Sequence, residues 1–123
     1  MVHEDVTDKI LRCAIKAHTA LGPALRERSY RSAMAIEMPF EGLQFEREPR
    51  LLVCYRGITI GQHRPDFIVE SKVVLEIKSA SRLESVFESQ VLTYLRVTGL
   101  HVGLLLNFNV SVLPHGIKRF VRS

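Results

Sequence analysis

Apolar positions recur at helical spacing over the first third of the chain and predict two helices. The first covers about residues 4–20, and its apolar face consists of Val6, Ile10, Cys13, Ala14 and Ala17. The dipeptide Gly22-Pro23 ends it. The second helix covers about residues 24–41 and ends at Gly42. Its expected buried face consists of Tyr30, Ala33, Met34 and Ile36.

The middle of the chain changes to the short alternating or apolar runs that are typical of strands. Residues 45–48 predict one strand, and residues 51–55 predict a hairpin with residues 58–60 across the turn Arg56-Gly57. Two further strands are expected over about 64–70 and 73–78, joined by Ser71-Lys72. Because both are almost continuously apolar, we expect them to be central in a sheet.

The last third predicts one more helix and two strands. The helix covers about residues 83–98, with an apolar stripe of Leu83, Phe87, Val91, Tyr94 and Leu95 and a cap at Gly99. A buried strand follows over 101–108, and residues 117–121 are expected to pair at an edge. Two helices, then strands, a helix and a strand predict an α/β fold with a mixed central sheet flanked by helices, forming a single domain over residues 1–123.

Composition and charge change this picture little. The net charge is +4, and twelve of the seventeen cations are arginine, which suits bidentate contacts with phosphate. No signal-peptide pattern is visible, and the longest apolar run, about residues 102–106, is too short to span a bilayer, so a cytoplasmic protein without a membrane partner is expected. Cys13 and Cys54 each lie in an apolar pattern and are interpreted as small core residues.

The residues that suggest chemistry lie on the two central strands. An antiparallel pairing of these strands about residue 71 brings Asp66 level with Glu76. Side chains alternate along a strand, so Glu76 and Lys78 share one face. The pattern therefore predicts two carboxylates and one ammonium group at one end of a hairpin.

Two close carboxylates repel each other, and a divalent cation relieves that repulsion. Oxygen ligands without His or Cys suit Mg²⁺ or Mn²⁺, and the backbone carbonyl of Ile77 would add one more oxygen. Lys78 could then orient a water molecule and stabilise the charge that develops on a phosphate. The spacing of His3, His18, His101 and His115 is not that of metal ligands, so no zinc site is expected.

The segment Pro65-Asp66 followed by Glu76-Ile77-Lys78 resembles the signature of the PD-(D/E)xK nucleases, whose core is the restriction-endonuclease-like fold. The chain further resembles the small GxxExxY proteins of that class. Glu27 and Tyr30 match the glutamate and tyrosine of their motif, and Ala24 stands where the motif begins with glycine, which puts a tight turn in doubt. Residues 90–95, 98–108 and 116–119 are similar as well, so the resemblance covers almost the whole chain.

The resemblance implies two more site residues. Glu27 would bring a third carboxylate to the metal, and Gln90 would complete the catalytic set of Asp66, Glu76 and Lys78. Glu27 has a plainer interpretation as a solvated first-turn glutamate that favours the helix dipole. Gln90 lies beside the apolar stripe of its helix, next to Val86, so it can face the edge of the sheet. Asp66 could equally end a strand, with Glu76 and Lys78 forming an exposed ion pair.

Three functions follow. The first is an enzyme, a Mg²⁺- or Mn²⁺-dependent nuclease that hydrolyses phosphodiester bonds of nucleic acid, with DNA favoured over RNA. The second is a non-catalytic nucleic-acid-binding or scaffolding module on the same fold; a core this small often needs a second copy, so a homodimer is one expected arrangement. The third is a small-molecule or protein-interaction domain whose acidic cluster is structural.

Overall fold

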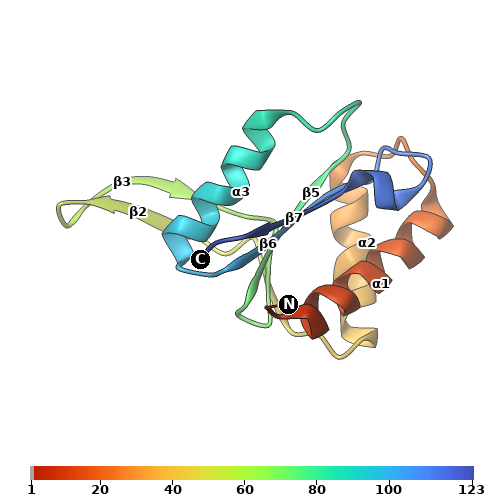
Figure 1. Ribbon diagram of the computed structural model, residues 1–123, viewed down its shortest axis with the longest axis horizontal. Coiled ribbons are helices and arrows are strands. Elements are labelled where there is room, and N and C mark those ends of the chain that lie inside the picture. Colours follow the sequence, from red (N-terminus) through yellow and green to blue (C-terminus); the bar gives the residue numbers. More distant parts are fainter. Residues whose placement is uncertain (1) are drawn as a thin grey trace.

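A computed structural model describes residues 2–123 (Figure 1). The elements in chain order are α1 (Glu4–Leu21), α2 (Glu27–Phe40), β1 (Phe45–Arg47), β2 (Leu51–Tyr55), β3 (Ile58–His63), β4 (Phe67–Val69), β5 (Val73–Lys78), α3 (Ser85–Thr98), β6 (Val102–Asn107), the short 3-10 helix η1 (Leu113–Gly116) and β7 (Ile117–Val121). The fold is α/β, as the pattern predicts.

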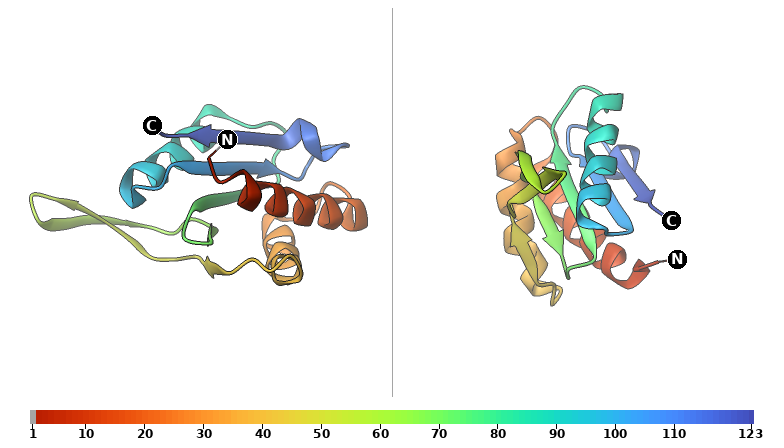
Figure 2. Two further views of the ribbon diagram at one scale, coloured as in Figure 1. Left: turned by 60° about the horizontal axis from the view of Figure 1, so that its bottom comes forward. Right: turned by 90° about the vertical axis from the view of Figure 1, so that its left-hand side faces the viewer.

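Five of the strands form one mixed sheet in the order β1-β4-β5-β6-β7. Only β5 and β6 run parallel, and α3 is the connection between them, because a parallel pair needs a crossover. The other neighbouring strands are antiparallel. Helices α1 and α2 cover one face of this sheet and α3 the other, which Figure 2 shows from two sides.

The alternation of side chains along β4 and β5 divides the core into two parts. Odd-numbered residues such as Phe67 and Leu75 pack with α1 and α2 in the larger cluster. Even-numbered residues such as Ile68 and Val74 pack with Tyr94 of α3 in a smaller one. Site residues with even numbers therefore belong to the face that α3 covers only in part.

Most elements lie within a few residues of their predicted bounds, and two burial predictions were wrong. Ile36 is 65% exposed, and Met38 occupies the buried position one turn after Met34, because the buried stripe of α2 follows i, i+4 spacing. Cys54 is exposed, whereas Cys13 is buried in the core. The strand that carries Cys54 has no second layer packed over it at that position.

The predicted hairpin exists but stands apart from the main sheet. Strands β2 and β3 pair antiparallel with each other in a two-stranded sheet, with a bulge between Val53 and Cys54. Arg56 and Gly57 both have positive φ, 50° and 77°, as a two-residue type I′ turn requires. The hairpin projects from the body of the molecule, and its base packs on α3 through Leu51 (Figure 1).

Candidate active site

Asp66 and Glu76 lie where the antiparallel ladder of β4 and β5 stops. The ladder pairs Phe67 with Leu75, and one step further the same register brings Asp66 opposite Glu76, as predicted from the sequence. There the carboxylates replace the ladder bonds: the Asp66 amide donates to Glu76 Oε1 at 2.7 Å, and the Ile77 amide donates to Asp66 Oδ2 at 2.7 Å. The two acidic side chains are therefore held by the ends of both strands.

Pro65 leaves a backbone oxygen of β5 without a ladder donor. The amide of Ile77 points toward β4, since it donates to Asp66, and the carbonyl of the same residue points to the same side. The next carbonyl, that of Lys78, points to β6 and accepts from the Phe108 amide at 2.9 Å. The residue opposite Ile77 is Pro65, which has no N–H to donate. The carbonyl of Ile77 is thus suited to act as a ligand beside the two carboxylates.

The remaining carboxylate oxygens face cations. Lys78 Nζ lies 3.9 Å from Glu76 Oε2, which confirms that the two side chains share a face. Arg31 Nη1 of α2 lies 3.6 Å from Asp66 Oδ1 and 3.4 Å from Glu27 Oε1. The sequence had indicated Glu27 but not Arg31, although Arg31 follows Glu27 by one helical turn and so shares its face. Glu27 borders the site through this arginine.

Burial dominates the electrostatics of the pair. Burial and, after it, the negative charge of Asp66 together raise the pKa of Glu76 to about 8. Burial also raises the pKa of Asp66, although the hydrogen bond from the Ile77 amide opposes the shift. Tyr94 lies close enough to respond: burial, followed by the charge of Glu76, raises its pKa to about 12. The site therefore disfavours two negative charges unless a cation accompanies them.

A groove beside Lys78 brings Gln90 to the site. It has a volume of about 400 Å³ and lies between the base of the β2–β3 hairpin and α3. Its lining includes Lys78, Gln90 and Tyr94 together with His63, whose ring meets that of Tyr94 edge-on at 5.9 Å. Gln90 therefore lies in the groove, next to Tyr94 and on the same helix. Lys78 is held there by the ring of Phe87, 4.7 Å from its Nζ.

Tyr30 and Ser79 fasten the loop before α2 to the end of β5. The Tyr30 hydroxyl donates to the Gly22 carbonyl at 2.5 Å and accepts from the Leu25 amide at 3.1 Å. Ser79 Oγ donates to the Leu25 carbonyl at 2.5 Å. The Tyr30 ring is fully buried and stacks on Phe108 at 4.5 Å. Tyr30 thus positions the start of α2, where Glu27 lies, and the interpretation as a core residue is confirmed.

Asn107 at the end of β6 fixes the segment that follows Lys78. Its Oδ1 accepts from the Ala80 amide at 3.0 Å and its Nδ2 donates to the Ala80 carbonyl at 3.0 Å. The same Oδ1 accepts from the Asn109 amide. Asn107 is 2% exposed, and a buried asparagine within an apolar strand is the signal that could have identified it. The sequence interpretation missed this residue.

The chemistry of the donor atoms fits a hard divalent cation. Asp66 Oδ1, Glu76 Oε2 and the Ile77 carbonyl are oxygen atoms on adjoining strands, and oxygen is the ligand atom that Mg²⁺ and Mn²⁺ prefer. Within residues 2–123, however, no three side chains of His, Cys, Asp or Glu gather closely enough to form a metal cluster. The arrangement thus offers two carboxylates, and Glu27 is not gathered with them.

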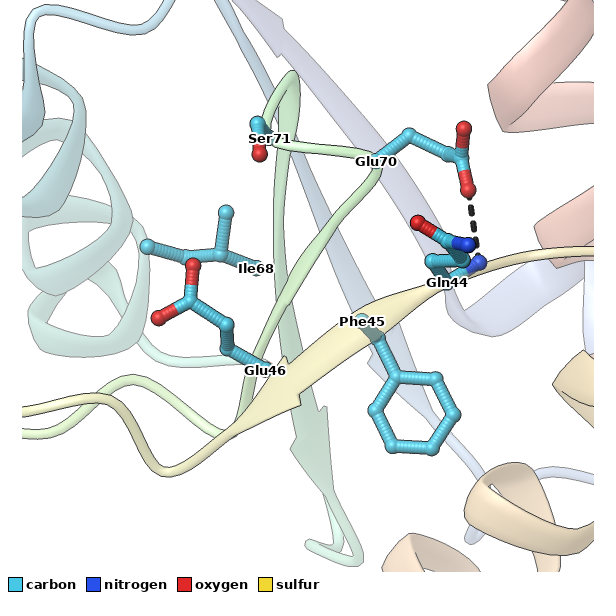
Figure 3. A pocket seen from close by; sticks show the side chains of 6 residues that line it. All are labelled: Gln44, Phe45, Glu46, Ile68, Glu70 and Ser71. Carbon is cyan, nitrogen blue, oxygen red and sulfur yellow. Dashed lines mark hydrogen bonds between the residues drawn. The ribbon is translucent and has the colours of Figure 1, made fainter.

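A second pocket lies at the opposite end of the β4–β5 hairpin and has no part in this site. It has a volume of about 220 Å³, and Figure 3 shows its lining: Gln44, Phe45, Glu46, Ile68, Glu70 and Ser71. Glu70 accepts a hydrogen bond from the Gln44 amide at 2.6 Å, so its carboxylate is used within the fold. The pocket adjoins the turn after β4, whereas Asp66 and Glu76 lie at the far ends of the two strands.

Comparison with known proteins connects this geometry to a family. A family model described as the PD-(D/E)XK nuclease superfamily matches residues 4–120. Searches of curated proteins and of solved structures each found no match. Within the described part of the chain, no helix has the length and apolar character that crossing a membrane requires. The narrower resemblance to the GxxExxY proteins stays a prediction. The match spans nearly the whole chain, so the chain belongs to the PD-(D/E)XK nuclease superfamily.

Proposed function

We propose that this chain is a Mg²⁺- or Mn²⁺-dependent nuclease that hydrolyses phosphodiester bonds of nucleic acid. The observation that carries the proposal is the pair of buried carboxylates, Asp66 and Glu76, locked onto the ends of β4 and β5 with Lys78 beside them. Membership of a nuclease superfamily supports it. Buried acidic groups with raised pKa values are unfavourable for the fold alone and are typical of functional sites.

The residues divide the reaction among them. Asp66, Glu76 and the Ile77 carbonyl would hold the cation, which supplies the positive charge that activates a water molecule and stabilises the transition state. Lys78, held by Phe87 and Glu76, is placed to orient that water and to stabilise the charge developing on the phosphate.

Glu27 and Gln90 have supporting places in this proposal. Glu27 would act from the start of α2 by holding Arg31 near Asp66, and it would become a further ligand only by moving toward the two carboxylates. Gln90 would act from the groove, where it can contact the substrate next to the scissile bond.

The test combines metal binding with cleavage. Calorimetric titration with Mn²⁺ should show binding to the wild type and none to Asp66→Asn, which keeps an acceptor for the Ile77 amide and so preserves the strand ends. Cleavage of DNA and RNA, double- and single-stranded, should vanish in the same variant and in Lys78→Ala. Asp8→Asn, at an exposed position of α1, is the matched control and should behave as wild type. Unchanged Mn²⁺ binding or cleavage in Asp66→Asn would overturn the assignment.

One observation favours the non-catalytic alternative. Arg31 lies 3.6 Å from Asp66 and already places a positive charge beside the carboxylates, and only two of them are close together. A binding module of this kind would show salt-sensitive affinity for nucleic acid and no cleavage with any divalent cation. The Mn²⁺ titration separates the two functions, because a non-catalytic module would show no heat of Mn²⁺ binding.

A further inference from the structure

The β2–β3 hairpin leaves large apolar side chains without a partner in the fold. Tyr55 is 64% exposed, Ile58 68%, Ile60 65% and Leu52 49%. An isolated two-stranded hairpin is only marginally stable in water, and a cluster of exposed apolar residues on it indicates an interaction site. The base of the hairpin packs on α3, but its outer half has exposed residues on both strands. This outer half, residues 52–60, is called the arm below.

The charges around the arm have one sign. From Pro49 to Pro65 the chain contains Arg50, Arg56 and Arg64 and no acidic residue. None of these arginines is ion-paired with another residue in the described chain. Arginines without a carboxylate partner, beside exposed apolar groups, suit a polyanion that also has apolar surface, and a nucleic-acid groove has both.

The tip of the arm holds an arginine in a backbone conformation that is unfavourable for it. Arg56 has φ 50° at the first position of the turn, where Asn, Asp or Gly is usual. Its guanidinium lies over the Tyr55 ring at 5.9 Å and is exposed. Since the fold gains little from arginine at this point, a role at the tip itself explains its presence better.

The arm begins next to the candidate active site and extends away from it. Strand β3 ends at His63, three residues before Asp66, and His63 lines the groove that contains Lys78. The six residues of β3 span about 20 Å, which exceeds the depth of about 8.5 Å of the major groove of B-form DNA, so the ribbon is long enough to reach the floor of that groove. A two-stranded ribbon fits that groove, whereas the major groove of A-form RNA is too narrow for it. The left view of Figure 2 shows the arm extending beyond the main sheet.

We propose that the arm enters the major groove of a DNA duplex whose backbone lies at Asp66 and Glu76. Arg56 at the tip contacts phosphate or a base edge, and the exposed apolar residues contact thymine methyl groups and sugars. This inference rests on the proposed nuclease function, which places the nucleic-acid backbone at Asp66 and Glu76. It concerns binding, however, and can be tested separately from cleavage.

The experiment measures binding of a short labelled DNA duplex by fluorescence anisotropy in EDTA, so that cleavage does not interfere. Arg56→Ala should weaken binding about tenfold and reduce the slope of log affinity against log salt by about one unit. Ile58→Ser should weaken binding severalfold with an unchanged slope, because an apolar contact releases no counterion. RNA duplex and single-stranded DNA should bind more weakly than the DNA duplex in the wild type.

Matched controls exist on the opposite side of the sheet. Ile36→Ser removes an equally exposed isoleucine from α2, and Arg12→Ala removes an exposed arginine from α1. Both should bind DNA as the wild type does. Wild-type affinity in both arm variants would overturn the proposal, as would equal affinity of the wild type for RNA duplex.

The other occupant to be distinguished is a second copy of this chain. Sedimentation of the same variants decides it: a wild-type dimer that becomes a monomer in Ile58→Ser, with DNA affinity unchanged, would refute the proposal in favour of that occupant. Mn²⁺ titration of the arm variants separates this inference from the proposed function. If the arm variants bind both Mn²⁺ and DNA as the wild type does, only the proposal that the arm binds DNA is refuted. If the wild type does not bind Mn²⁺, only the proposed nuclease function is refuted.

Discussion

Replacing Glu76 by glutamine should remove a large pH dependence from the stability of the metal-free protein. Glu76 is 4% exposed, and burial with the nearby Asp66 raises its pKa from 4.5 to about 8. Glutamine keeps an oxygen that can accept the hydrogen bond from the Asp66 amide, and it has no charge to bury. The substitution therefore changes the protonation behaviour of the site with little change in its shape.

The sign and size follow from the raised pKa. A carboxyl group whose pKa is higher in the folded state stabilises the fold below its unfolded pKa, and this contribution is lost as the pH rises to the folded pKa. For Glu76 the window runs from 4.5 to about 8, which corresponds to about 5 kcal/mol in the free energy of unfolding. Between about pH 5.5 and about pH 7.5 the wild type should lose about 3 kcal/mol that Glu76→Gln does not lose.

Urea unfolding followed by circular dichroism in EDTA, at these two pH values, measures the difference. Histidines titrate in the same range, but they are common to both proteins and cancel when the two pH dependences are subtracted. Glu46→Gln, at an exposed carboxylate of β1, is the control and should keep the wild-type pH dependence. The same pH dependence in Glu76→Gln as in the wild type would refute the reasoning, because Glu76 would then be ionised throughout.

Two further predictions concern the loop that precedes Glu27 and α2. Tyr30→Phe should lower the free energy of unfolding by about 2 kcal/mol, because the Leu25 amide and the Gly22 carbonyl both lose their partner; urea unfolding measures this, and a neutral result would show that water replaces the hydroxyl. Ala24→Gly should increase the free energy of unfolding by about 0.5–1 kcal/mol and so raise the melting temperature, because Ala24 has φ 76°, a conformation that glycine adopts more easily. Ala20→Gly, within α1, is the control and should lower the melting temperature. Destabilisation by Ala24→Gly would contradict this account.

The central part of the site could be predicted from residue parity alone. The turn at Ser71 places residues 66 and 76 opposite each other, and alternation puts Glu76 and Lys78 on one face. Both relations depend only on local strand geometry and a short connection, so the structure confirms them without adjustment. The positive φ of Ala24 likewise shows a tight turn at the position where the GxxExxY motif, which this segment resembles, has glycine.

What the sequence did not reveal depends on contacts between distant segments. Arg31 meets Asp66 only because α2 crosses the end of β4, and Asn107 meets Ala80 only because β6 lies beside β5. The exposure of Cys54 has the same origin: its apolar pattern is that of a strand in a core, yet the hairpin forms its own sheet outside the core. The apolar pattern of the sequence identifies the strand, but it does not show whether another layer of the fold covers that strand.

The scaffold around the candidate site explains how a small fold can tolerate two buried acids. Every segment at the end of β5 is tied to another: Ser79 to the loop before α2, Ala80 to Asn107, and the Lys78 carbonyl to the Phe108 amide. These bonds and the stacked rings of Tyr30 and Phe108 hold the strand ends whether or not the carboxylates are charged. Movement of the strands therefore does not relieve the repulsion between Asp66 and Glu76. In the metal-free protein a proton on Glu76 relieves it, as the raised pKa of Glu76 indicates, and Arg31 and Lys78 offset the remaining negative charge in part. A divalent cation would take the place of that proton and offset both charges more fully.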